Sequence, residues 1–165
     1  MAFHLAQVNL ARPLEPLDSE LLADFVAALD PVNAVADGSP GFVWRLQTEE
    51  GNATAIPVLD DDSLIVNMSL WESIGALRAF VYTSPAHLGV MKRRREWFER
   101  MEFHMALWWV PAGHLPTVAE AEERLTLLRA LGPSPDAFTF RRHFPPPDEG
   151  PGGAAIDDDR WLCPA

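Results

Sequence analysis

The segment 84–98 contains a histidine and an arginine at a spacing that could support acid-base chemistry. A neutral imidazole at His87 could act as a general base, and Arg95 could hold the carboxylate, phenolate or enolate of a substrate. Asn67, in an otherwise apolar stretch, could stabilise the same negative charge. The alternatives are structural, with His87 bonding to nearby backbone and Arg95 forming a buried ion pair with Glu99 or Glu102.

Aromatic side chains are the candidates for substrate binding. The chain has six tryptophans, more than packing alone usually needs. We predict a pocket for an aromatic or polyketide-like ligand, lined by Trp44, Trp97, Phe98, His104 and Trp108. Trp71 and Trp109 are further candidates by the same argument. The alternative is that these rings form the core or a subunit interface.

Metal-binding and cofactor-binding motifs are weak or missing. Glu102 and His104 share one face of a predicted strand, and His4 lies on another strand, so three metal ligands are conceivable. In the expected sheet, however, His4 lies nearer Trp109 than His104. The chain has no HxxxH, HxH or CxxC spacing, and no GxGxxG, GxxxxGK[ST] or GxSxG motif. We therefore predict neither a metal ion nor a cofactor.

The elements that would position these residues follow from hydrophobic periodicity and from capping signals. Strands are predicted at 3–10, 42–47, 64–70 and 103–110. Helices are predicted after Asp18 and before Pro31, after Ser73, from Pro85, and after Thr117 in a capping box with Glu120. A short edge strand is expected at 137–140. His114, just before the last helix, either stabilises a turn or lines the mouth of a barrel.

The helix that starts at Pro85 carries the catalytic candidates. Its inward face is marked by Leu88, Met91 and Phe98, which recur at helical spacing. Arg95 lies on this same stripe, whereas Arg93 should point outward. A cation on the inward side of a helix needs either an ion-pair partner or a ligand.

The order of strand, helix, two strands, helices, strand and helix is the split pattern of a ferredoxin-like fold. The predicted class is therefore α+β, with an antiparallel sheet and helices on one face. Apolar residues on both sides of three strands suggest that the other face is also covered. A two-fold homodimer would cover it with one self-complementary surface, which gives a dimeric α+β barrel.

Four stretches carry a resemblance to a known family: SPAH at 84–87, MKRRREWF at 91–98, LWWVPAGH at 107–114 and AFTF at 137–140. Together they resemble the DUF3291 family, a domain of unknown function, over about residues 3–144. That family is similar to the dimeric α+β barrel superfamily, which includes antibiotic-biosynthesis monooxygenases, polyketide cyclases and haem-binding members. The resemblance implies the fold, a dimer and a place in secondary metabolism. It leaves the reaction open, because such folds host many activities.

Composition is typical of a single globular domain. A length of 165 residues suits one core, predicted at 1–144, and the Pro-, Gly- and Asp-rich segment 145–165 is predicted to be a disordered tail. A net charge of −11 disfavours nucleic-acid and anionic-membrane partners, because their phosphates would be repelled. The single cysteine, Cys163, excludes an internal disulfide. No signal peptide or transmembrane run is visible, so we expect a cytoplasmic protein.

These features favour a cofactor-independent enzyme that acts on an apolar aromatic or polyketide-like metabolite, as a monooxygenase, cyclase or isomerase. One alternative is a haem-binding protein in which a histidine is the axial ligand. The other is a non-catalytic dimer that binds a small hydrophobic ligand.

Overall fold

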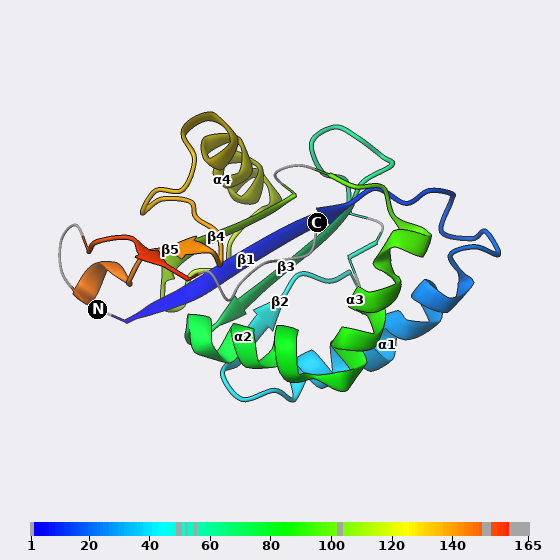
Figure 1. Ribbon diagram of the computed structural model, residues 1–165, viewed down its shortest axis with the longest axis horizontal. Coiled ribbons are helices and arrows are strands. Elements are labelled where there is room, and N and C mark those ends of the chain that lie inside the picture. Colours follow the sequence, from blue (N-terminus) through cyan, green and yellow to red (C-terminus); the bar gives the residue numbers. More distant parts are fainter. Residues whose placement is uncertain are drawn as a thin grey trace.

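The computed structural model describes residues 2–48, 51, 53–54, 56–101, 104–149 and 153–158. Figure 1 shows a central sheet with helices on both sides. In chain order the elements are β1 (Phe3–Ala11), α1 (Ala23–Asp37), β2 (Phe42–Arg45), β3 (Ile65–Trp71), α2 (Ile74–Thr83), α3 (Pro85–Trp97), β4 (Met105–Pro111), α4 (Val118–Leu131), β5 (Arg142–His143), a 3-10 turn (Pro147–Glu149) and β6 (Ile156–Asp157).

The long strands form one antiparallel sheet in the order β2-β3-β1-β4. β1 lies between β3 and β4, with Gln7 opposite Ser69 on one side and Leu107 on the other. This is the strand order of a ferredoxin-like fold, and it confirms the predicted α+β class. The predicted first residue of the fourth strand, Phe103, lies outside the described residues.

Helix α1 differs from its prediction at both ends. Leu22 rather than Asp18 precedes it, and no side chain caps its first turn. The helix continues through Pro31, although proline lacks the N–H that an interior position would donate. Phe25 on its inner side packs against Trp97 at 5.6 Å between ring centroids. Packing of this kind outweighs the local cost of the proline, and local signals alone did not reveal it.

Helices α2, α3 and α4 begin where the capping signals predicted. Ser73 Oγ accepts a hydrogen bond from the N–H of Ala76, and Pro85 occupies the first turn of α3. Thr117 Oγ1 accepts a hydrogen bond from the N–H of Glu120 at the start of α4. The predicted capping box is only half formed, because the Glu120 carboxylate bonds to other side chains.

The two faces of the sheet are covered by different parts of one chain. Helices α1, α2 and α3 lie over the face that carries Leu5, Trp71 and Leu107 (Figure 1). Helix α4 and the loop between β2 and β3 cover the opposite face, where Leu125 and Leu128 pack on the even-numbered residues of β1, β3 and β4. The structure therefore differs from the expectation that helices lie on one face alone. A homodimer no longer follows from an uncovered face, and it stays a prediction.

The edge of β4 that does not pair with β1 forms an isolated β-bridge with the segment that follows α4. Leu107 and Phe138 exchange two backbone hydrogen bonds of 2.8 Å each. The edge strand predicted at 137–140 is thus present only as an isolated bridge. Beyond it, β5 pairs with β6, and Arg78 of α2 bonds to Asp158 at 2.9 Å.

The predicted disorder of the tail stays a prediction for 150–152 and 159–165, which lie outside the described residues, as do Trp161 and Cys163. None of the helices in the described ranges has the length and apolar character needed to cross a membrane.

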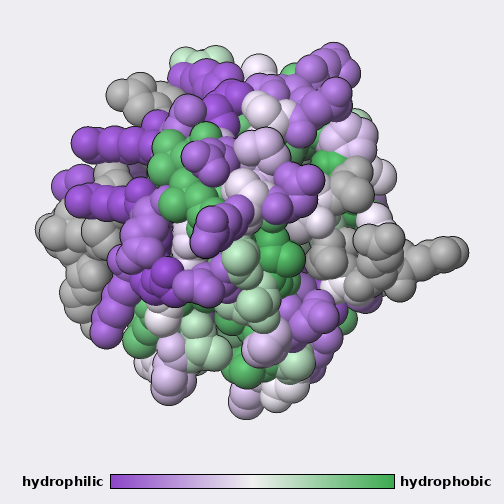
Figure 2. Space-filling model, turned by 90° about the vertical axis from the view of Figure 1, so that its right-hand side faces the viewer, coloured by the Kyte–Doolittle hydropathy of each residue, from purple (hydrophilic) through white to green (hydrophobic). Residues whose placement is uncertain are grey.

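Apolar side chains also reach the outer surface. On the side of the molecule that lies to the right in Figure 1, hydrophobic residues alternate with hydrophilic ones (Figure 2). Over the described chain, the exposed large apolar residues are Leu14, Leu21, Val26, Val35, Val43, Leu115, Leu131 and Ile156.

Candidate functional site

A cavity of about 230 Å³ lies between the sheet and the helices α1, α2 and α3. Most of its lining is aliphatic or aromatic. Its polar groups come from strands β1, β2 and β3, from α3 and from the start of β4, with a few from α1 and the adjoining loops. An apolar cavity with a few polar groups at fixed positions is the usual form of a small-molecule site.

One wall of this cavity is aromatic. Trp71 stacks on Phe80, with ring centroids 5.3 Å apart and an angle of 23° between the planes. Phe80 in turn contacts the imidazole of His87 at 5.0 Å, and Phe42 meets the Trp71 ring edge-on at 5.4 Å. This series of rings links the end of β3 to the start of α3 and fixes the position of His87.

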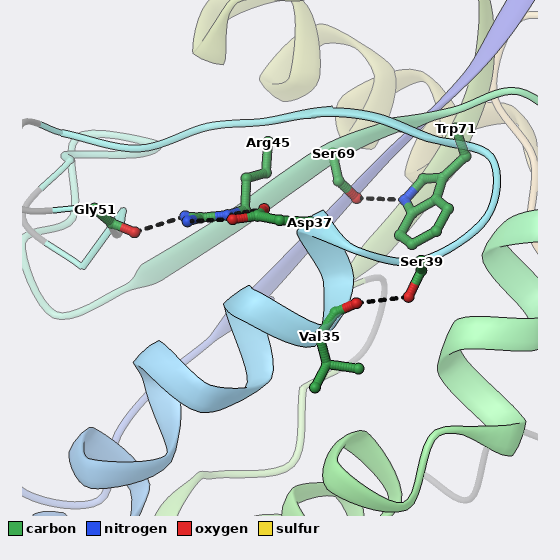
Figure 3. Close-up of polar contacts among 7 residues, drawn as sticks. All are labelled: Val35, Asp37, Ser39, Arg45, Gly51, Ser69 and Trp71. Atoms are coloured by element: carbon green, nitrogen blue, oxygen red, sulfur yellow. Dashed lines mark hydrogen bonds and ion pairs between the residues drawn. The ribbon is translucent and has the colours of Figure 1, made fainter.

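Four polar residues form a strip on the floor of the cavity. Gln7 and Asn9 of β1 lie opposite Ser69 and Asn67 of β3. Trp71 Nε1 donates to Ser69 Oγ at 2.9 Å (Figure 3), and Ser69 Oγ donates to Gln7 Oε1 at 3.0 Å. Gln7 and Ser69 are buried, at 8% and 7% exposure, whereas Asn67 is exposed.

His87 is held in its neutral form. Its Nδ1 lies 2.9 Å from the carbonyl oxygen of Val81. Since a carbonyl can only accept, Nδ1 carries the hydrogen and Nε2 keeps its lone pair. Burial lowers the pKa of His87, although the hydrogen bond to Val81 opposes this shift. The ring is therefore neutral at about pH 7, with Nε2 able to accept a proton.

His104 repeats this arrangement at the start of β4. Its Nδ1 donates to the carbonyl of Met101 at 3.0 Å. Burial lowers the pKa of His104; the hydrogen bond to Met101 opposes this shift, and the positive charge of Arg94 adds to it. Within the described part of the chain, Nε2 of neither His87 nor His104 has a hydrogen-bond partner. The cavity thus holds two neutral imidazoles, with Arg94 in its lining.

Arg45 of β2 closes one side of the cavity. Its Nε and Nη2 donate to the two carboxylate oxygens of Asp37 at 2.7 and 3.2 Å, and its Nη1 donates to the carbonyl of Gly51 at 2.6 Å (Figure 3). These bonds connect β2 to the last turn of α1 and to the loop that leads to β3. Because Asp37 balances its charge, we assign Arg45 a structural role.

The structure places part of the predicted site around this cavity. Four of the predicted residues line it: Asn67, His87, Phe98 and His104. Arg95 has an exposed side chain, and Arg94 lines the cavity instead. Met91 and Phe98 line the cavity as the predicted stripe requires, but His87 and Arg94 accompany them in place of Leu88 and Arg95.

Three of the predicted tryptophans lie away from the cavity. Trp108 is buried on the opposite face of the sheet under α4, and Trp44 packs against the same core. Trp97 is buried too, with the guanidinium of Arg93 4.7 Å above its ring. These side chains serve packing, as the structural alternative held. Trp71 is the tryptophan that lines the cavity.

The remaining histidine candidates lie elsewhere. His4 is opposite Val110, far along β4 from His104, as the strand order predicted. His114 is exposed, and its Nε2 lies 2.8 Å from the Glu120 carboxylate, which fits a role in the turn before α4. Over the described ranges, no group of three or more His, Cys, Asp or Glu residues could hold a metal ion.

A family model described as "Domain of unknown function (DUF3291)" matches residues 4–152. The chain belongs to the DUF3291 family. The match includes all four sequence stretches that carried the resemblance, and in this DUF3291 chain three of them lie largely in α3 and β4. No curated protein matches the sequence.

Several solved structures are similar to this DUF3291 chain in part. SnoaB, a cofactor-independent oxygenase from Streptomyces nogalater, has a TM-score of 0.47 and 20% identity, covering 70% of this chain and 100% of SnoaB. A candidate antibiotic biosynthesis monooxygenase from Chloroflexus aurantiacus has a TM-score of 0.46 and 14% identity, covering 67% and 96%. Rv0793 from Mycobacterium tuberculosis has a TM-score of 0.44 and 16% identity, covering 69% and 99%.

Several cavity residues were not in the predicted site. Arg94 was not predicted because Arg95, its neighbour, was placed on the inward stripe instead. Gln7 and Ser69 were overlooked because amides and hydroxyls carry no motif of their own. A signal was nevertheless present, since Gln7 and Asn9 on one strand, and Asn67 and Ser69 on another, are polar residues at alternate positions of otherwise apolar strands.

Proposed function

We propose that this DUF3291 protein is a small-molecule enzyme that works without a bound cofactor, binds an apolar cyclic or aromatic metabolite in the cavity, and begins its reaction by removing a proton. His87 is the base, and Arg94 and Asn67 stabilise the negative charge that forms. The observation that carries this proposal is a neutral imidazole, with its Nε2 lone pair unused, at the wall of an apolar cavity. Arg94 takes the part first given to Arg95.

Proton removal is the step that monooxygenase, cyclase and isomerase reactions of this type share. A C–H or O–H bond of the substrate breaks, its electron pair stays on the substrate as an enolate or phenolate, and the proton goes to Nε2 of His87. The anion then reacts with molecular oxygen, attacks a carbonyl carbon, or takes a proton back at another position. A guanidinium and an amide N–H at the cavity wall stabilise this anion in a medium that is drier than water.

The size of the cavity limits the ligand. A protein cavity of about 150 Å³ holds benzene, and pockets for drug-sized ligands begin near 300 Å³. The cavity here has about 230 Å³, so it takes one or two rings. A larger polyketide-like substrate would extend out of the cavity past exposed lining residues such as Asn67.

The haem-binding alternative fits the cavity poorly. Nε2 of His87 or His104 could serve as an axial ligand, because Nδ1 is held by a carbonyl in each ring. A haem, however, is larger than the drug-sized ligands that need at least about 300 Å³. Purified protein with a Soret band would revive this alternative. A non-catalytic binder needs no base, and the next experiment separates it from an enzyme.

The first prediction concerns His87 as the base. We expect the protein to accelerate exchange of the C2 hydrogens of 1-indanone for deuterium in D₂O, and His87→Gln to lower the protein-dependent rate about 100-fold, since a positioned general base contributes roughly 10²–10⁴-fold. Glutamine retains an N–H that can donate to Val81 but cannot accept a proton. Proton NMR of the ketone measures the exchange.

The matched control is His114→Gln, which changes an exposed histidine outside the cavity and should leave the rate unchanged. If the ketone binds but exchanges no faster than in buffer, the protein is a non-catalytic binder. If His87→Gln is folded and as active as the wild type, another group is the base.

The homodimer, the cytoplasmic location and the place in secondary metabolism belong to the same proposal. The dimer and the metabolic role come from the family resemblance, and the location comes from the sequence.

A further inference from the structure

Gln7 is the most deeply buried polar side chain in the cavity lining that retains unused hydrogen-bonding groups. It is 8% exposed and lies in the middle of β1 on the cavity floor. Its Oε1 accepts the hydroxyl hydrogen of Ser69. Its amide group Nε2 donates no hydrogen bond to the described part of the chain.

The orientation of this amide follows from its neighbours. Trp71 Nε1 can only donate, and it donates to Ser69 Oγ at 2.9 Å. The hydroxyl hydrogen of Ser69 is then left to donate, and it meets Gln7 Oε1 at 3.0 Å. A flipped amide would turn Nε2 toward Ser69, whose hydroxyl oxygen already accepts from the indole. The chain of bonds therefore directs the two N–H bonds of Gln7 away from Ser69.

Unused donors in such a place need an explanation. Gln7 Nε2 is not one of the fully buried atoms of the described residues that lack a partner, so it is accessible from the cavity that Gln7 lines. Its two N–H bonds are therefore available to water or to a ligand in the cavity. A leucine at this position would fill the same place on β1 without offering any donor. A fixed pair of donors in an apolar cavity is the arrangement that binds an oxygen atom of a ligand.

We infer that Gln7, oriented by Ser69 and Trp71, binds the carbonyl oxygen of the substrate, and that the substrate class is a small cyclic or aryl ketone. The reaction rests on the proposed function. When a hydrogen at the carbon next to the carbonyl leaves as a proton to a cavity histidine, the C–H electron pair forms a C=C bond and the carbonyl π pair moves to oxygen. The enolate oxygen then accepts hydrogen bonds from the same two N–H groups of Gln7. These bonds strengthen as negative charge builds up on the oxygen.

The test compares two probes that differ only in the oxygen. 1-Indanone and indane have the same bicyclic frame, and only the ketone can accept from Gln7. Isothermal titration of the full chain should give a dissociation constant about fivefold lower for 1-indanone than for indane, the size expected for one added hydrogen bond. In Gln7→Leu the two constants should become equal. In Ser69→Ala, where the amide is no longer held, the preference should shrink part of the way.

Gln47→Leu is the matched control, because Gln47 is an exposed glutamine outside the cavity and its loss should leave the preference intact. Equal binding of both probes to the wild type, or a preference that survives in folded Gln7→Leu, overturns the inference. Should Gln7→Leu fail to fold, Ser69→Ala decides the matter in the same way.

The outcomes separate this inference from the proposed function. If both probes bind equally while the His87-dependent exchange of 1-indanone persists, Gln7 is satisfied by water alone and only the inference fails. If neither probe binds, the cavity is not a site for such ligands, and the inference fails together with the proposed function.

Discussion

Burial lowers the pKa of His87 below the ordinary value of 6.5, so the imidazole is mostly neutral at neutral pH. Only the neutral imidazole can accept a proton from 1-indanone at Nε2. The rate of deuterium exchange should therefore stay nearly constant as the pH falls to 6.5, and it should decrease only at lower pH, where His87 becomes protonated. We expect the midpoint of this acid limb below 6.5 when the wild-type rate is followed by NMR from about pH 5 to 8. A midpoint at or above the ordinary value would mean that a more solvated group is the base.

Single residues also show how much of the site the sequence could predict. The types of His87, His104 and Asn67 made them candidates, and all three line the cavity. The sequence did not show that Arg94 rather than Arg95 lines the cavity, because one residue turns a side chain by about 100° and the run of cations contains no apolar residue that fixes the orientation. The roles of these residues in a reaction stay predictions. The orientation of an amide such as Gln7 depends on a neighbouring strand, which no local pattern describes.

At the scale of elements, Glu120 connects α4 to the sheet. Its carboxylate accepts Trp108 Nε1 at 2.9 Å and His114 Nε2 at 2.8 Å. Burial alone would raise the pKa of Glu120, but the hydrogen bonds from His114 and Trp108 outweigh it and lower the pKa. Trp108 is only 1% exposed, so water cannot readily replace Glu120 as the acceptor of its indole N–H.

We therefore expect Glu120→Ala to lower the free energy of unfolding by about 1–3 kcal/mol, as measured in urea, because a buried indole N–H loses its acceptor. Glu120→Gln keeps an acceptor oxygen and should cost clearly less. Equal losses in the two variants would show that charge at the start of α4, rather than the bond to Trp108, carries the effect.

The elements themselves were predictable where local signals and tertiary packing agree. β1, β3 and the starts of α2, α3 and α4 fall within a residue or two of their predictions, since alternation and capping act within a few positions. The extent of helix α1 was not predicted correctly. Pro31 is a local signal for the end of a helix, but the packing of α1 against α3 overrides it. The side on which α4 lies was also missed, since an amphipathic stripe does not state which face of a sheet it covers.

For the whole molecule, the single chain buries both faces of its sheet. The core under α4 and the core under α2 each consist of residues of one copy. The melting temperature should therefore not change over about a 100-fold dilution, even if light scattering detects the expected homodimer, because mass action shifts stability only when folding requires the partner. A melting temperature that falls on dilution would show that the second copy completes the fold.

Strand β2 stands at one end of the strand order and is four residues long, with an irregular register against β3. Unpaired backbone at a sheet edge is a template on which another chain can add a strand and begin an aggregate. So short and irregular an edge offers few consecutive N–H and C=O groups in line. This edge of the sheet is therefore a poor template for the addition of a strand from another copy.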